Sequence, residues 1–289
     1  MSDLLPADML DHVADHLHDK PETLKQCCLV SKSWIPRTRK YLFADIEFYT
    51  AKDMQSWKEM FPDPSTSPAH YAQSLFVGHP QAVTAADGEA GGWITGFSCI
   101  VSLTVGTPRL GTGPPSSLVP FHGFSPALKS LKVGFTVVPL PQIFNLILSF
   151  PLLEDLTVMT SHDTAMADGD GSDWLLTTTQ PPVPLKLTGS LELFLQGGME
   201  LAARRLLSLP GGIHFRRLSL PCVCEEDLLA ITGLVEGCTH TLESLQIAEL
   251  PGTSIWHLFP RQWLTSVSRR VEDSFDRPLE RNEACRRGD

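Results

Sequence analysis

The chain has 289 residues, of which 42% are hydrophobic and 19% charged, so its length allows between one and three domains. Its net charge of −10 and the lack of a long basic run argue against nucleic acid as the main partner. The 7 cysteines follow no disulfide-framework spacing, which predicts reduced thiols. Acidic residues occupy the place of a basic signal-peptide leader, and no apolar run reaches the ~20 residues of a membrane span. Together these features predict a cytoplasmic or nuclear protein.

Residues 4–43 have the pattern of three short helices. The apolar residues of the first helix recur at helical spacing, at Met9, Leu10, Val13, Ala14 and Leu17. Pro21 and Pro36 suit the first turns of a second and a third helix, because proline is tolerated there. Three helices in about forty residues bury little apolar surface by themselves. We therefore expect this unit to pack on the next domain or on a partner.

These N-terminal residues resemble an F-box. The stretches LPADMLDHVADHL, LKQCCLVSKSW and KYLF carry the resemblance. The matched features are Leu5-Pro6, an acidic residue at Asp8, the apolar helix that follows, the block from Leu29 to Trp34, and Leu42-Phe43. With the repeats that come after it, the chain is similar to the F-box proteins found in fungi.

An F-box docks on an adaptor of the Skp family, which links it to a cullin-based ubiquitin ligase, and the resemblance implies the same partners for this chain. Carried over by position, the residues that would form or support the adaptor contact are Leu5, Pro6, Met9, Leu10, Val13, Leu17, Leu29, Val30 and Trp34. The alternative is that these residues bury against the following domain as an N-terminal cap. Leu5-Pro6 precedes the first helix, where a cap has less need of it, and this favours the partner.

A short strand pattern recurs through most of the remaining chain. The middle apolar residues of its eight copies are Ile46, Leu75, Leu103, Leu131, Leu156, Leu193, Leu218 and Leu245. Their intervals of 25 to 37 residues mostly fall within the range of leucine-rich repeats, which is roughly 20–29 residues. Alternate residues of each copy point into one core, and neighbouring copies must stack to bury it. This predicts an α/β chain, with an F-box over residues 1–43 and an irregular leucine-rich-repeat solenoid with a parallel sheet over residues 44–267.

Helical segments are expected between the later strands, at residues 141–149, 198–207 and 225–237. The earlier intervals are rich in Pro, Gly, Ala and Ser, and they predict irregular chain in place of a helix. Residues 161–184 lengthen one interval and predict a protruding loop. After the last strand, an aromatic-rich segment up to residue 267 predicts a helical end cap, and residues 268–289 predict a mobile charged tail.

Two motifs point weakly to metal ions. Residues 168–173 resemble the start of a calcium loop, but the sixth and twelfth positions are Asp173 and Thr179 instead of the required Gly and Glu. Cys222 and Cys224 have no second cysteine pair at zinc-site spacing. Neither motif therefore predicts a metal site.

His12 and His16 are four residues apart on the first predicted helix and could share a metal ion, although an exposed polar helix face also explains them. No G-x-S-x-G motif surrounds a serine, and no glycine motif extends to a phosphate-binding loop. The sequence alone brings no two carboxylates together. We therefore predict no metal, no cofactor and no enzymatic activity.

The leading hypothesis is a substrate-receptor subunit of a ubiquitin ligase, whose concave repeat face binds a target protein. The candidate target contacts are the strand residues that alternate with the core leucines, and they include Lys132, Asp155, Thr157, Glu192, Phe194, Arg217, Ser219 and Gln246. Most are expected to be simply hydrated, because a minority of interface residues carry the binding energy. The alternative hypothesis is a leucine-rich-repeat interaction scaffold without a ligase link.

Overall fold

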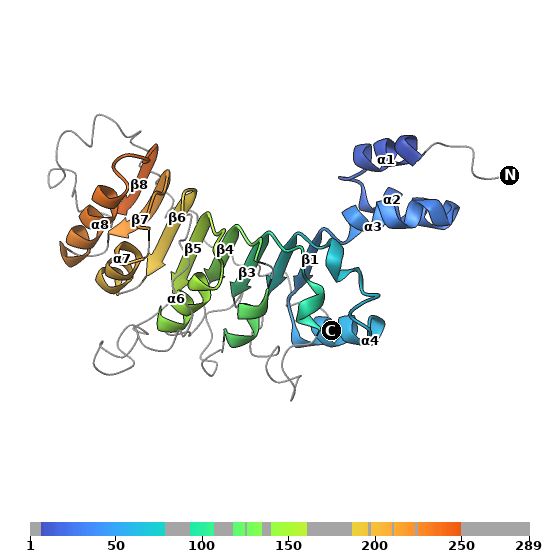
Figure 1. Ribbon diagram of the computed structural model, residues 1–289, viewed down its shortest axis with the longest axis horizontal. Coiled ribbons are helices and arrows are strands. Elements are labelled where there is room, and N and C mark those ends of the chain that lie inside the picture. The colour runs from blue at the N-terminus through green and yellow to red at the C-terminus, as the bar shows by residue number, and fades with distance from the viewer. Residues whose placement is uncertain are drawn as a thin grey trace, which may run out of the picture.

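The computed structural model describes residues 7–78, 93–106, 118–124, 126–134, 140–160, 187–195, 198–209, 211–222 and 225–249. They form an α/β structure built on one eight-stranded sheet (Figure 1). The predicted loop at residues 161–184, the end cap after residue 250 and the tail at residues 268–289 lie outside the described residues, as do Leu5 and Pro6.

The N-terminal part folds into the predicted three-helix unit. Its elements are α1 (Ala7–His16), α2 (Pro21–Val30), the 3-10 turn η1 (Lys32–Trp34) and α3 (Ile35–Leu42). Pro21 stands in the first turn of α2, as the sequence predicts. The Asp11 carboxylate pairs with the Arg37 guanidinium at 2.5 Å and ties α1 to α3. The buried side chains of the unit are Leu10, Ala14, Leu24 and Thr38.

Eight short strands follow, and each pairs in parallel with the next strand of the chain. They are β1 (Asp45–Phe48), β2 (Ser74–Val77), β3 (Ser102–Gly106), β4 (Ser130–Gly134), β5 (Asp155–Thr160), β6 (Ser190–Leu195), β7 (Arg217–Cys222) and β8 (Ser244–Glu249). The order of the strands in space equals their order in the chain. The predicted parallel sheet is therefore confirmed.

The strand register corrects one predicted position. Leu156 of β5 pairs with Leu191 of β6, and Leu191 pairs in turn with Leu218 of β7, so the prediction of Leu193 as the matching leucine is wrong by two residues. Leu191 and Leu193 are both buried on the same face of the strand. Because side chains alternate with a period of two, a shift of two residues leaves the hydrophobic pattern unchanged.

Helices connect the strands along one side of the sheet (Figure 1). They are α4 (Ala51–Met60), α6 (Leu140–Leu148), α7 (Met199–Leu207) and α8 (Glu225–Gly237), with the 3-10 turns η2 (Pro68–Tyr71), η3 (Ile94–Gly96) and η4 (Val119–Gly123). The three helices predicted after β4, β6 and β7 are confirmed. Gly198, just before α7, has a φ of 74°, a left-handed conformation that favours glycine.

The prediction that the early intervals contain irregular chain is wrong for the first of them, because α4 lies between β1 and β2. The Thr50 hydroxyl accepts the Asp53 amide at 3.2 Å, and the Asp53 carboxylate accepts the Thr50 amide at 2.7 Å. This reciprocal capping starts the helix despite its weak apolar period. Met54 and Trp57 are its buried residues, and their spacing of three is too little to reveal a helix by periodicity.

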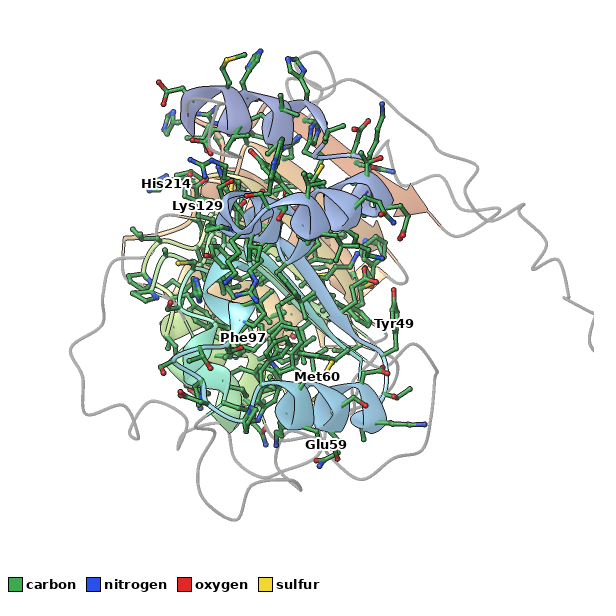
Figure 2. All side chains as sticks on the ribbon, turned by 90° about the vertical axis from the view of Figure 1, so that its right-hand side faces the viewer. Tyr49, Glu59, Met60, Phe97, Lys129 and His214 are labelled. Carbon is green, nitrogen blue, oxygen red and sulfur yellow. The ribbon has the colours of Figure 1, made fainter. Side chains whose placement is uncertain are left out.

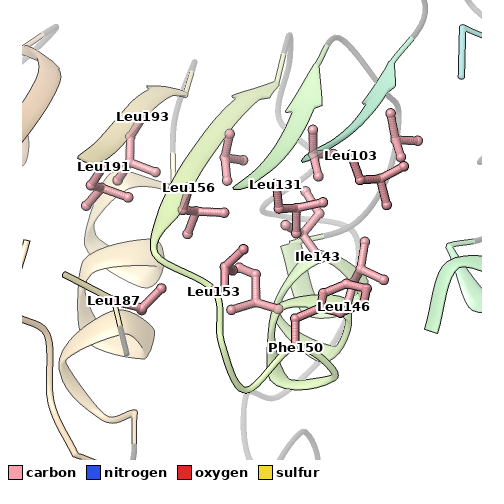
Figure 3. Close-up of a cluster of buried hydrophobic side chains, with 14 of the residues drawn as sticks. Leu103, Leu131, Ile143, Leu146, Phe150, Leu153, Leu156, Leu187, Leu191 and Leu193 are labelled. Atoms are coloured by element: carbon pink, nitrogen blue, oxygen red, sulfur yellow. The ribbon is translucent and has the colours of Figure 1, made fainter. Parts of the chain in front are cut away.

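One hydrophobic core runs along the inner face of the sheet. Figure 3 shows its middle, where Leu103, Leu131 and Leu156 of three adjacent strands lie above Ile143 and Leu146 of α6. Each layer of core side chains therefore rests on the layer of the next strand. The strand residues that alternate with these core side chains lie on the opposite face of the sheet.

Candidate protein-interaction surfaces

Four apolar side chains of the three-helix unit are exposed. Met9 and Val13 on α1 are 53% and 39% exposed, and Leu29 and Val30 at the end of α2 are 81% and 77% exposed. Single exposed apolar residues are normal on a protein surface. Here two lie on α1 and two at the end of α2, and all four are available for a partner to cover. We call these four residues the apolar helix face.

The α1 part of the apolar helix face, Met9 and Val13, follows from the apolar pattern of that helix. Met9 and Val13 are four residues apart and therefore share one side of the helix. Leu10 and Ala14 occupy the neighbouring side, which is buried against the rest of the unit. α1 thus carries a wider apolar surface than the core of three short helices can cover.

The other residues predicted for the adaptor contact have different environments. Leu10 is buried, so it supports the packing of α1 instead of presenting a surface. Leu17 and Trp34 are half-buried at the edges of the unit. The predicted set therefore divides into exposed positions and positions that hold the exposed ones in place.

All eight residues predicted to contact a target lie on the face of the sheet that points away from the core, because the buried residues alternate with them. Lys132, Phe194 and Arg217 are exposed, and the other five are half-buried. The strand register aligns five of them in one row across β4 to β8, in the order Lys132, Thr157, Glu192, Ser219 and Gln246. We call this row the outer sheet row.

Hydrogen bonds already engage part of this face. The Thr157 hydroxyl donates to Glu192 Oε2 at 3.2 Å and links β5 to β6. Asp155 Oδ1 accepts the amide and the hydroxyl of Ser190, at 2.7 and 2.6 Å. Asp155 was predicted as a target contact, and the structure gives its carboxylate a role in joining two strands.

Sequence reasoning missed an aromatic pair at the N-terminal end of the same face. The ring of Tyr49, just after β1, lies 5.1 Å from the ring of Phe76 in β2, and Figure 2 shows Tyr49 pointing outward while Phe97 lies inside. The Tyr49 hydroxyl donates to Glu47 Oε2 at 2.6 Å, which raises the pKa of Tyr49. The outward position of Phe76 could have been predicted from the sequence, because Phe76 directly follows the core residue Leu75.

Within the described ranges, no group of three or more His, Cys, Asp or Glu side chains is arranged to hold a metal ion, and no helix has the length and apolar character to cross a membrane. The calcium-like residues 168–173 and the Cys224 thiol lie outside those ranges. Comparison with protein-family models, with curated proteins and with solved structures returned no significant match to this chain.

Proposed function

We propose that this chain is a substrate-receptor subunit of a Skp/cullin/F-box ubiquitin ligase. The observation that carries the proposal is the exposure of Met9, Val13, Leu29 and Val30 in a three-helix unit whose sequence resembles an F-box. Four of the residues that the resemblance assigns to the adaptor contact are thus available to a partner. If they served as a cap on the sheet, they would be buried within the chain.

The energetics support a docking role for the apolar helix face. Complete burial of a Val, Leu or Met side chain contributes ~1.5–3 kcal/mol relative to leaving it in water. Leu29 and Val30 retain most of their accessible surface, so nearly all of that gain is left for a partner. An adaptor with a complementary apolar groove would obtain it without unfolding any part of the unit.

The outward face of the sheet supports the second part of the proposal, the binding of a target protein. The outer sheet row presents side chains from successive strands of a stacked scaffold, and extended repeat faces of this kind bind proteins. A target held there would be tethered to the ligase through the three-helix unit. The chain itself would perform no chemistry and would raise the concentration of the target near the transferring enzyme.

Titration of the full chain with a purified Skp-family adaptor tests the proposal. Val13→Asp combined with Leu29→Asp should abolish the heat of binding, because two charges would enter an apolar contact. Lys132→Asp is the matched control, since it places the same residue at an exposed site on the sheet. Equal binding by the double variant and the wild type would remove the ligase link and leave the interaction scaffold.

A further inference from the structure

The two histidines of α1 turn their nitrogen edges toward each other. His12 Nε2 lies 3.1 Å from His16 Nε2, whereas the centres of the two rings are 4.4 Å apart. The two ring planes are nearly perpendicular, at an interplanar angle of 77°. Both residues are exposed, so the space around the two nitrogens is open to an ion from solution.

The helix backbone sets this arrangement. A spacing of four residues places two side chains one above the other on the same side of a helix. In metalloproteases the same spacing of two histidines on one helical face binds zinc. Two zinc–nitrogen bonds of about 2.0–2.1 Å to nitrogens 3.1 Å apart meet at an angle of about 100°, between the octahedral and tetrahedral values.

We propose that His12 and His16 form a two-histidine chelate for a divalent transition-metal ion of the zinc class. Neutral imidazole nitrogen suits zinc, copper and nickel, and the helix supplies two such ligands already in position. The remaining coordination positions take water or a group from a bound partner, because no third histidine, cysteine or carboxylate of the described residues joins the pair. This inference goes beyond the proposed function and does not depend on it.

His18, the third histidine of this region, contacts the backbone instead of the His12–His16 pair. His18 Nδ1 lies 2.8 Å from the Asp15 carbonyl oxygen, so one of its nitrogens is engaged with the backbone. Asp15 in turn accepts the Tyr41 hydroxyl. A simple hydrogen bond between His12 and His16 is the competing account of the 3.1 Å distance.

Calorimetric titration of the full chain with zinc chloride at neutral pH distinguishes the two accounts. The wild type should bind one more zinc ion than either His12→Ala or His16→Ala, and His18→Ala should match the wild type. Zinc should also raise the melting temperature of the wild type more than that of the two variants, because a bound ion stabilises the folded helix. Metal-free melting temperatures should agree, since the replaced side chains are exposed.

Identical zinc stoichiometry in the wild type, His12→Ala and His16→Ala would overturn the proposal and leave the hydrogen-bonded pair. A loss of zinc binding in His18→Ala equal to that in His12→Ala would overturn it as well, because the binding would then not belong to the pair. Adaptor binding is absent from this experiment, so its outcome is independent of the ligase proposal.

Discussion

Between β5 and β6, the Asp155 carboxylate accepts the Ser190 amide, whereas a backbone carbonyl accepts the corresponding amide at other strand junctions. At the preceding junction the Lys129 carbonyl accepts two amides, from Glu154 at 2.8 Å and from Asp155 at 2.9 Å. Between β5 and β6 the Glu154 carbonyl accepts the Gly189 amide at 3.0 Å, and Asp155 Oδ1 accepts the Ser190 amide at 2.7 Å. The carboxylate thus completes the junction at the longest interval of the chain.

Asp155→Ala should therefore lower the stability of the sheet. The Ser190 amide would lose a charged acceptor, which costs ~1–3 kcal/mol, with the lower end expected because Asp155 is half-buried. Asp155→Asn keeps one acceptor oxygen and should lose less. Urea unfolding of both variants measures the difference, with Lys132→Ala as an exposed control on the neighbouring strand. Equal midpoints for all three variants would show that the Asp155 contact contributes nothing.

Gly189→Ala tests the same junction from the other side. A Cβ atom at position 189 would clash with Asp155 Oδ1 and would stand 2.9 Å from the Glu154 carbonyl oxygen. The substitution should displace the carboxylate from Ser190 and destabilise the chain. Its effect should shrink in an Asp155→Ala background, because neighbouring substitutions that disturb one contact are not additive. Fully additive losses in this double-mutant cycle would contradict the contact.

The stacked core is tested by Leu156→Asp. The side chain is 1% exposed and faces the core leucines of the adjacent strands, so the new carboxylate would be buried without a partner. We expect a loss of several kcal/mol. Lys132→Asp introduces the same residue on the outward face of the preceding strand, β4, and should melt close to the wild type. A melting temperature of Leu156→Asp near that of the control would show that the assignment of strand faces is wrong.

Cys238 should resist alkylation in the native chain. Burial raises the pKa of its thiol from the ordinary value of 9.0 to about 11. The protonated thiol therefore favours folding below pH 9, and this contribution is lost as the pH rises toward 11. Peptide mapping after iodoacetamide treatment at pH 8 should find exposed Cys99 labelled and Cys238 unlabelled unless urea is present. Rapid native labelling of Cys238 would contradict its burial.

The strands could be predicted because their outward and inward residues alternate, and this alternation is visible even in segments as short as Leu131-Lys-Val133. The register of β6 could not, since Leu191 and Leu193 both face the core. Only the hydrogen bonds of the β5–β6 junction distinguish the two pairings. Hydrophobic patterning thus determines the face of a strand, whereas register depends on the geometry of its junction.

The candidate surfaces were predictable in part for a related reason. Periodicity identifies Met9, Leu10 and Val13 as apolar residues of one helix, but it does not show which of them the small unit can cover. Burial of Leu10 and exposure of Leu29 depend on how the three helices pack. The role of Asp155 was equally hidden, because its partner Ser190 is 35 residues away in the chain.

Hydrogen–deuterium exchange of the full chain, with and without a purified Skp-family adaptor, tests the central claim most directly. We expect slower exchange of the α1 and α2 amides when the adaptor is present. Exchange in β4 to β8 should be unchanged, because we propose that these strands bind the target and not the adaptor. Protection confined to the sheet, or no protection of α1 and α2 at saturating adaptor, would contradict it.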